Sequence, residues 1–280
     1  MRVKKALVLF LSFCLALSLT ACNQGDGDSV SAKSTSKKML FYIGITMVRP
    51  VSILAERFEQ LHTDENLEIV IVQGGSQDLY NSITSSQQGD LYLPGALSYR
   101  KNNVHEGFLT DFQFVGYNRA AIVVRKGNPK NIPANLGIFT SRDVRSILCN
   151  PESGSIGQET KNVLTEFGNC QEAFANAAFL STDSRKLNKE LRDDNADVTI
   201  NWRATAFWDD NSKYLDVLPI DETYAKKKML VFNLLSTSKY PELARQFMAY
   251  AASEGGRRVF YTYGFLNDAD LENFDKVIVE

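Results

Sequence analysis

The sequence predicts an α/β fold with two lobes, and three observations lead to this prediction. Apolar runs typical of buried strands alternate with segments whose apolar residues recur at helical spacing. Alternation of this kind favours largely parallel sheets covered by helices. About 240 residues follow the pattern without an internal repeat, which is more than a single hydrophobic core usually organises.

The first part of the pattern contains five predicted strands and two predicted helices. The strands are 39–45, 67–72, 91–93, 112–117 and 120–124. One helix begins near Pro50, whose missing N–H costs little in a first turn, and continues with apolar residues at helical spacing. A shorter helix that carries Leu79 and Ile83 follows the glycine-serine segment 74–76.

The second part of the pattern continues the alternation to the end of the chain. The predicted strands are 144–149, 198–200, 215–218 and 229–234. The predicted helices are 156–167, 171–179, 185–192, 241–252 and 255–263.

The N-terminus has the pattern of an export signal that ends in a lipidated cysteine. A basic start (MRVKK) precedes residues 6–19, which carry no charge. That stretch is shorter than the roughly 20 residues of a membrane-spanning helix. It ends in Leu-Thr-Ala-Cys, which resembles the lipobox of bacterial lipoproteins. Residues 1–21 are therefore predicted to be a lipoprotein signal peptide and Cys22 the lipidated residue, with an ordinary secretory peptide as the alternative.

Residues 22–38 are predicted to be a flexible tether. They are polar and rich in Gly and Ser, with almost nothing to bury. We therefore expect a domain outside the cytoplasm, in the periplasm or at the cell surface, held to a membrane by the lipid on Cys22. Which membrane carries the anchor stays open.

Composition and motifs disfavour several classes of protein. Lys and Arg number 31 against 33 Asp and Glu, so the basic excess of a nucleic-acid-binding protein is missing. Four Cys and two His leave little material for a metal cluster. The phosphate loop of nucleotide hydrolases, the dinucleotide-binding glycine motif and the nucleophile elbow of hydrolases are all missing from the sequence. We therefore expect no enzyme, no cofactor and no metal site.

Hydroxyl residues follow three predicted strands at the point where a helix begins. Thr46 follows the first strand, Ser76 follows the second, and the segment 151–155 (PESGS) precedes the helix at Ile156. Ordinary helix capping would explain each hydroxyl singly. Several helix N-termini that converge on one anion would explain all three, because each supplies N–H donors and partial positive charge. Both interpretations stay open at this point.

The order of these segments resembles that of type II periplasmic binding proteins, in particular the binding component of molybdate/tungstate ABC transporters. Five segments carry the resemblance: 73–79 (QGGSQDL), 89–94 (GDLYLP), 150–157 (NPESGSIG), 198–202 (VTINW) and 247–265 (FMAYAASEGGRRVFYTYGF). The last is the most specific. Trp202 departs from the family pattern, which has tyrosine there, and this leaves the identity of the anion open.

The resemblance implies a cleft between two lobes joined by a two-segment hinge. Lobe 1 would comprise 39–119 and 227–280, lobe 2 would comprise 120–226, and the chain would cross near 117–121 and 221–229. The ligand would be a small oxyanion such as molybdate or tungstate, passed to the permease of an ABC importer by a monomeric protein. By position, the implied ligand contacts are Thr46, Ser76, the backbone N–H groups near Ile156 and Ser184, and Trp202.

Alternative ligands and functions remain at the level of sequence. Phosphate, sulfate or a small carboxylate would suit a site that Asp78, Arg49 or Arg203 enters, since arginine pairs with such anions and an acid accepts the proton of phosphate. A lipid-anchored hydrolase or envelope-assembly factor is a further alternative, disfavoured because no nucleophile–base pair can be named.

Once residues 1–21 are removed and Cys22 is modified, the thiols of the mature chain are Cys149 and Cys170. An exported chain meets an oxidising compartment, which favours a disulfide between them, and two free thiols are the alternative.

Overall fold

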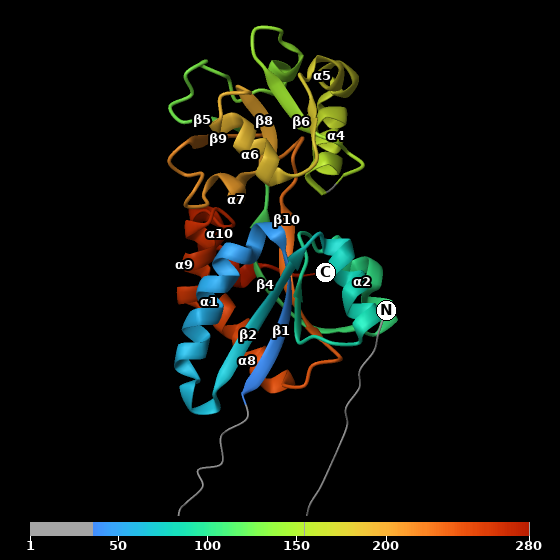
Figure 1. Ribbon diagram of the computed structural model, residues 1–280, viewed down its shortest axis with the longest axis vertical. Coiled ribbons are helices and arrows are strands. Elements are labelled where there is room, and N and C mark those ends of the chain that lie inside the picture. Colours follow the sequence, from blue (N-terminus) through green and yellow to red (C-terminus); the bar gives the residue numbers. More distant parts are fainter. Residues whose placement is uncertain (1–35, 154, 280) are drawn as a thin grey trace, which may run out of the picture. The chain divides into compact units, whose positions relative to one another are not determined.

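The computed structural model describes residues 36–153 and 155–279, which fold into two five-stranded sheets with helices packed around them (Figure 1). The expectations for the signal peptide, for Cys22 and for the tether up to residue 35 lie outside the described residues. Among the described residues, no helix is both long enough and apolar enough to cross a membrane.

The first sheet is mixed, with one strand opposed to the others. Across the sheet its strands are β2 (Leu67–Gly74), β1 (Lys37–Gly44), β3 (Leu91–Leu93), β10 (Lys228–Leu235) and β4 (Leu109–Asn118). β1 pairs in parallel with β2 and β3, whereas β10 is antiparallel to both β3 and β4. The helices around it are α1 (Val48–Leu61), α2 (Ser76–Ser86), α3 (Ser98–Asn103), α8 (Pro241–Ala252), α9 (Glu254–Thr262) and α10 (Asp268–Glu272).

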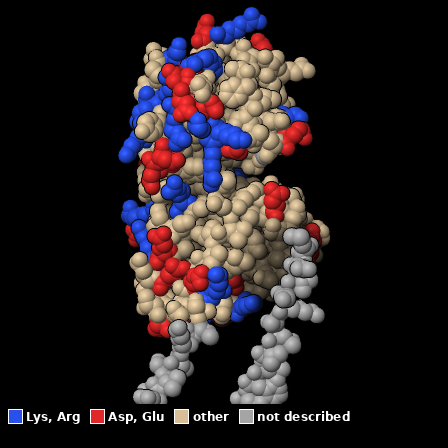
Figure 2. All heavy atoms as spheres, viewed as in Figure 1, with Lys and Arg blue, Asp and Glu red and all other residues tan. Residues whose placement is uncertain are grey.

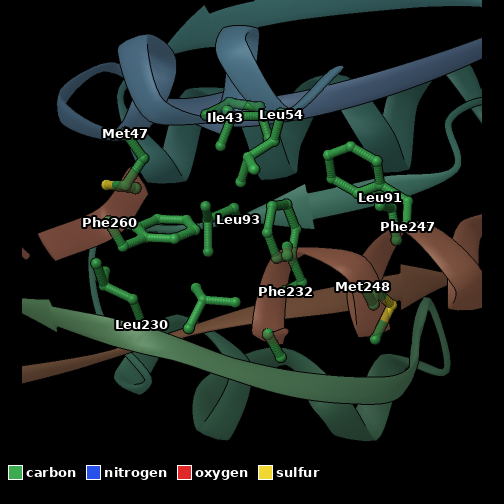
Figure 3. Close-up of a cluster of buried hydrophobic side chains, with 14 of the residues drawn as sticks. Ile43, Met47, Leu54, Leu91, Leu93, Leu230, Phe232, Phe247, Met248 and Phe260 are labelled. Carbon is green, nitrogen blue, oxygen red and sulfur yellow. The ribbon is translucent and has the colours of Figure 1, made fainter. Parts of the chain in front are cut away.

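Alternating side chains on β1 divide the apolar residues between two faces of this sheet. Phe41 and Ile43 belong to the core beneath α1, α8 and α9, and Tyr42 belongs to a smaller cluster beneath α2. This two-residue period is the expected consequence of the pleated backbone. Phe247 of α8 packs edge-on against Phe41 and Phe232, with ring centroids 4.7 and 5.7 Å apart (Figure 3). Each buried phenylalanine contributes about 1.5–3 kcal/mol, and the shared rings fix how α8 lies on the sheet.

The second sheet repeats the arrangement with its own opposed strand. Across the sheet its strands are β7 (Leu180–Ser181), β6 (Ser146–Cys149), β8 (Val198–Trp202), β5 (Ala120–Arg125) and β9 (Leu215–Pro219). β6 is parallel to β7 and β8, and β5 is antiparallel to β8 and β9. Its helices are α4 (Ser155–Phe167), α5 (Cys170–Asn176), α6 (Ser184–Arg192) and α7 (Arg203–Ala206).

The chain passes twice between the two sheets. β4 ends at Asn118 and β5 begins at Ala120, so a single residue joins the sheets in the first passage. In the second passage the chain leaves β9 and enters β10. The linking residue, Arg119, is held by Asp270, whose buried carboxylate lies 2.6 Å from the guanidinium. The two opposed strands, β5 and β10, are therefore the two strands that follow the passages.

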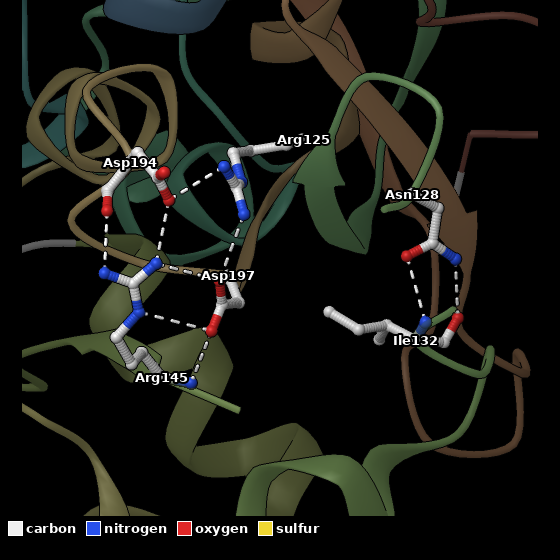
Figure 4. A network of polar contacts seen from close by, with 6 residues as sticks. All are labelled: Arg125, Asn128, Ile132, Arg145, Asp194 and Asp197. Atoms are coloured by element: carbon white, nitrogen blue, oxygen red, sulfur yellow. Dashed lines mark hydrogen bonds and ion pairs between the residues drawn. The ribbon is translucent and has the colours of Figure 1, made fainter. Parts of the chain in front are cut away.

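A charge network fixes the far end of β5 to the start of β6 (Figure 4). The carboxylate of Asp197 lies 3.0 Å from Arg145 and 3.3 Å from Arg125, and both arginines also reach Asp194. Burial raises the pKa of Asp197, but hydrogen bonds from the Arg145 side chain and backbone outweigh it and the pKa lies below its ordinary value. The carboxylate therefore stabilises the fold as an anion.

The structure confirms the α/β fold class and corrects the sequence prediction in several details. The sheets are mixed, because the strand that follows each passage runs against its neighbours. The short elements α3, α7, α10 and β7 have too few residues to show a period. The helix predicted at 171–179 ends at Asn176, since Ala177 is already extended.

Cys149 and Cys170 are free thiols in this structure, which is the alternative to the disulfide considered from the sequence. Cys149 is buried at the end of β6, with its sulfur 3.7 Å from the Ser153 hydroxyl. Cys170 begins α5 and packs, partly buried, on the edge of the apolar core.

Candidate functional site

All five side chains or backbone positions expected to contact the ligand line one pocket of about 210 Å³ between the two sheets. The first sheet and its helices contribute Gly44, Ile45, Thr46, Gly74, Gly75, Ser76, Asp78, Gly95 and Asn118. The second sheet and its helices contribute Ser153, Ser155, Ile156, Thr182, Asp183, Ser184 and Trp202. The structure thus brings Thr46, Ser76, Ile156, Ser184 and Trp202 together from segments far apart in the sequence.

The Ser76 hydroxyl is available as a donor in the pocket. Ser76 is the first residue of α2 and is only 9% exposed. Its Oγ accepts a hydrogen bond of 2.9 Å from the Gly95 backbone N–H, and its carbonyl accepts one of 2.8 Å from the Tyr92 hydroxyl. Because the Gly95 bond uses the oxygen as an acceptor, the Ser76 hydroxyl proton remains available to a ligand.

The Thr46 hydroxyl is also available as a donor. Thr46 is buried in the short 3-10 helix Ile45–Met47 that follows β1. Its Oγ1 donates to the sulfur of Met47 at 2.8 Å. A thioether is a weak acceptor, so an anion in the pocket would compete for this proton at little cost.

Two helices of the second sheet point their N-termini at the same pocket. Ser155 and Ile156 begin α4, and Ser184 begins α6. The first N–H groups of a helix have no partner inside the helix and carry partial positive charge. A Cβ on Gly157 would lie 2.0 Å from the Asn150 carbonyl oxygen, so only glycine lets α4 begin this close to the preceding turn.

Asp183 occupies part of the α6 N-terminus. Its Oδ1 accepts hydrogen bonds of 2.9 Å from the backbone N–H groups of Arg185 and Lys186. These two donors are therefore already satisfied within the protein. The Ser184 N–H, to which the sequence analysis pointed, is the α6 donor that this cap leaves free.

A buried amide network positions Trp202 and Ser184, and the sequence analysis missed it. Asn201 on β8 donates from Nδ2 to the Ser184 carbonyl at 3.0 Å and to Asn188 at 2.7 Å. Its Oδ1 accepts from the Trp202 backbone N–H at 2.8 Å. Satisfied buried networks are rigid, so this one fixes the end of β8 against the start of α6. Asn201, an amide within the otherwise largely apolar segment 198–202, is the trace that the network leaves in the sequence.

Asn118 is a second residue that the sequence analysis missed. It ends β4, is 1% exposed and lines the pocket, and its Oδ1 has no hydrogen-bond partner among the described residues. A buried acceptor without a donor costs about 1–3 kcal/mol, so a water or a ligand that donates to Asn118 Oδ1 would be stabilised there. In the sequence, the only indication of this role is that Asn118 is a polar residue between the predicted strands 112–117 and 120–124.

The lining of this pocket contains carboxylates and, among the described residues, no Lys or Arg. Asp78 enters it, lying over Gly75, where a Cβ would come within 3.1 Å of the carboxylate. Arg49 lies elsewhere and pairs with Asp210 at 3.7 Å. Arg203 donates to the Gly264 carbonyl and likewise does not line the pocket. The donors facing the pocket are therefore hydroxyls, backbone N–H groups and helix N-termini.

A second cavity of about 520 Å³ adjoins the pocket on one side. It shares Gly95, Ser155 and Trp202 with the pocket and extends over α3. Lys228 of β10 spans its rim to the buried Glu159 of α4 at 3.1 Å. Among the described residues no group of three or more His, Cys, Asp or Glu side chains could hold a metal ion.

Comparison with known proteins gives a family and a fold. The model of the family "Bacterial extracellular solute-binding protein" matches residues 39–266. A putative binding protein of Haemophilus influenzae is 20% identical over 228 residues, covering 81% of this chain and 90% of the relative.

Two solved structures have the same fold at low sequence identity. The substrate-binding domain of a putative molybdenum ABC transporter from Clostridium difficile is 17% identical, with a TM-score of 0.67, and the match covers 82% of this chain and 98% of that one. The sulfate-binding protein SubI from Mycobacterium tuberculosis is 15% identical, with a TM-score of 0.68, and the match covers 86% of this chain and 92% of SubI.

Proposed function

Because this chain belongs to the bacterial extracellular solute-binding proteins, we propose that it captures a small oxyanion in the pocket of Thr46, Ser76 and Trp202 and delivers it to an ABC importer. The observation that carries the proposal is the convergence of two buried hydroxyls and two helix N-termini on one small pocket. The fold neighbours described as molybdenum-transporting and sulfate-binding support an oxyanion as the class of ligand.

We propose that the pocket lies in a cleft that opens and closes about the two chain passages. Lobe 1 would comprise 39–119 and 227–280, and lobe 2 would comprise 120–226. The hinge segments would be 117–121 and 221–229. A ligand that contacts Ser76 from one lobe and the α6 N-terminus from the other would stabilise the closed form through its differential contacts.

The leading ligand class is a fully deprotonated tetrahedral dianion of the molybdate, tungstate or sulfate type. Such an ion accepts hydrogen bonds only, which suits hydroxyls, backbone N–H groups and the indole N–H of Trp202. A pocket of about 210 Å³ has room for one such ion and a few waters, since each water occupies roughly 30 Å³ in the liquid. Hydrogen bonds to a charged acceptor in a partly enclosed site are short and strong.

Hydrogen phosphate is the second candidate, and two observations favour it. It carries a proton at neutral pH, so a selective site needs an acceptor. The Asp78 carboxylate lines the pocket, and Asn118 Oδ1 is buried there without a donor. Either group would accept a hydrogen bond from the protonated oxygen of hydrogen phosphate.

Calorimetric titration of the dialysed protein with molybdate, tungstate, sulfate, phosphate and chromate tests the proposal. At least one anion should bind with one site per chain, and Ser76→Ala should weaken it. If none of the five produced saturable heat, the oxyanion function would be wrong.

The Asp78→Asn variant distinguishes the two ligand classes by the sign of its effect. Removing a negative charge should tighten binding of a deprotonated dianion several-fold. The same change should weaken binding of hydrogen phosphate, because an acceptor for its proton is lost. Ser82→Ala on the same helix is the matched control, since its hydroxyl bonds only to the Asp78 carbonyl at 2.8 Å among the described contacts.

We also propose that the protein is exported, processed after residue 21 and held outside the cytoplasm by lipid on Cys22. The tether predicted at 22–38, of which Lys37 and Lys38 belong to β1, would then let the solute-binding domain reach a permease in the same membrane. The sequence pattern at residues 1–22 supports this anchor.

A further inference from the structure

A third cavity, of about 460 Å³, is lined by formal positive charge. It lies beside the pocket of Thr46, Ser76 and Trp202, which is called the oxyanion pocket below after its proposed ligand. Five basic side chains line the third cavity: Arg49, Arg185, Lys186, Lys189 and Arg192. Asp210 is the one acidic residue in its lining. The two pockets share Ile45, and Ser184 of the oxyanion pocket precedes Arg185 in the chain. Figure 2 shows Lys and Arg gathered over α6, above the groove between the sheets.

The carboxylates around this basic pocket do not balance its cations. Asp210 is shared, lying 3.7 Å from Arg49 and 3.3 Å from Arg192. Lys186 lies 3.8 Å from Asp183, and Lys189 pairs with Asp193. Three carboxylates therefore serve four of the five cations. Among the described residues the fifth, Arg185, has no carboxylate partner.

Arg185 reaches across the groove instead. Its Nη2 donates to Gln73 Oε1 at 2.9 Å, and Gln73 lies near the end of β2 in the first sheet. Arg49 also comes from the first half of the fold, through α1, while the other four cations lie on α6. A ligand in the basic pocket would thus contact residues attached to both sheets.

Trp208 supplies an apolar wall and an unused donor. The residue is 6% exposed and lines the basic pocket, and its indole Nε1 has no hydrogen-bond partner among the described residues. The Arg185 guanidinium carbon lies 6.0 Å from the centroid of the indole ring. A guanidinium held near an aromatic face presents its N–H groups in a fixed fork that suits phosphate or carboxylate oxygens.

We infer that the basic pocket is a second anion site, which takes a small molecule with two or more closely spaced phosphate or carboxylate groups. Several converging cations repel one another, and a polyvalent anion relieves that repulsion at several points at once. A neutral solute would leave Arg185 without an anionic partner. The pocket is wider than the oxyanion pocket and binds through formal charge, so its affinity should fall steeply with salt, in contrast to a site built from helix N-termini.

The ligand of this site could be a separate polyanion or the second charged end of one molecule that also fills the oxyanion pocket. The probe is inorganic diphosphate, titrated calorimetrically at constant ionic strength into the full-length protein. A separate site keeps its diphosphate affinity when the oxyanion pocket is saturated with the anion that binds there most tightly. If one ligand fills both pockets, the saturating anion removes most of the diphosphate affinity.

Two tryptophans allow the pockets to be observed separately. Trp202→Phe leaves Trp208 as the reporter of the basic pocket, and Trp208→Phe leaves Trp202 as the reporter of the oxyanion pocket. Diphosphate should change the emission of the Trp202→Phe protein. The double change Arg185→Gln with Lys186→Gln should weaken diphosphate binding at least tenfold. The control is Lys161→Gln, an exposed cation of α4 outside both pockets, which should leave affinity within a factor of two.

Three results would overturn the inference. The first is the absence of saturable diphosphate binding at low ionic strength. The second is diphosphate binding that Ser76→Ala weakens while the Arg185 and Lys186 changes leave it intact, which would place the ion in the oxyanion pocket alone. The third is equal weakening by the Lys161 control, which would indicate nonspecific attraction. None of these results bears on whether molybdate or sulfate binds to the oxyanion pocket, so the two proposals fail separately.

Discussion

Ser76→Ala is the sharpest test of the proposal that the pocket binds an anion through neutral donors. The side chain is 9% exposed, and its oxygen already accepts from the Gly95 N–H, which leaves one proton to donate. Losing one hydrogen bond to a charged acceptor costs about 1–3 kcal/mol. Since about 1.4 kcal/mol is a factor of ten, the dissociation constant of the oxyanion should rise roughly 5- to 150-fold.

The same substitution has a cost in stability that must be measured apart from affinity. Gly95 would lose its acceptor, which should lower the free energy of unfolding by about 1 kcal/mol. Calorimetric titration of the folded protein gives the affinity, and urea unfolding without ligand gives the stability. Ser82→Ala on the same helix should change neither.

The reasoning fails if Ser76→Ala binds as tightly as the wild type while Arg49→Ala or Arg203→Ala abolishes binding. Neither arginine lines the oxyanion pocket, so such a result would require a different site and a ligand recognised by guanidinium groups. A Ser76→Ala protein that lost stability and kept affinity would also contradict the donor role.

Three further predictions follow from the remaining features. Cys22→Ala should release into the soluble fraction a protein that otherwise partitions with membranes. A wild-type protein that incorporated no labelled fatty acid would refute the lipid anchor. Intact mass after alkylation of the unfolded protein without reductant should show Cys149 and Cys170 as free thiols; in the folded protein Cys170 should react first, because burial raises the pKa of Cys149. The pKa of Asp197 lies below its ordinary value, so its contribution to stability is present at neutral pH and is lost as the pH falls through the folded-state pKa. Arg145→Gln should therefore move the midpoint of acid unfolding, followed by circular dichroism, to higher pH. An unchanged midpoint would show that Arg145 does not stabilise the Asp197 carboxylate.

The sequence indicated two hydroxyls that line the pocket, because these hydroxyls are tied to local structure. Thr46 and Ser76 each follow a strand at the point where a helix begins, and that position can be recognised in a short segment. Parallel strands bring such positions to the same edge of their sheet, so several of them meet without any long-range information. The sequence alone could not distinguish helix capping by these residues from ligand binding, because that distinction requires knowing that they line one pocket.

Groups placed by long-range packing could not be predicted in the same way. Asn118 lines the pocket because the first chain passage buries it, and Asn201 orients Ser184 through a contact between β8 and α6. Whether Arg203 enters the pocket depends on a hydrogen bond to Gly264, 61 residues further along the chain. Each of these contacts joins residues distant in the sequence, and no local period or motif encodes them.

The basic pocket is the strongest case of a feature that composition conceals. The chain has a formal net charge of −2, which argues against any strongly basic surface. Four cations nevertheless lie along α6, where Lys189 and Arg192 alternate with the buried Leu187 and Leu191. That periodicity is ordinary for an exposed helix, and only the two chain passages bring Arg49 from the other half of the fold to the same cavity. Net charge measures the whole chain, whereas affinity for a polyanion depends on the few charges within a Debye length of about 10 Å of the bound ion, so a near-neutral protein can hold a strongly cationic site.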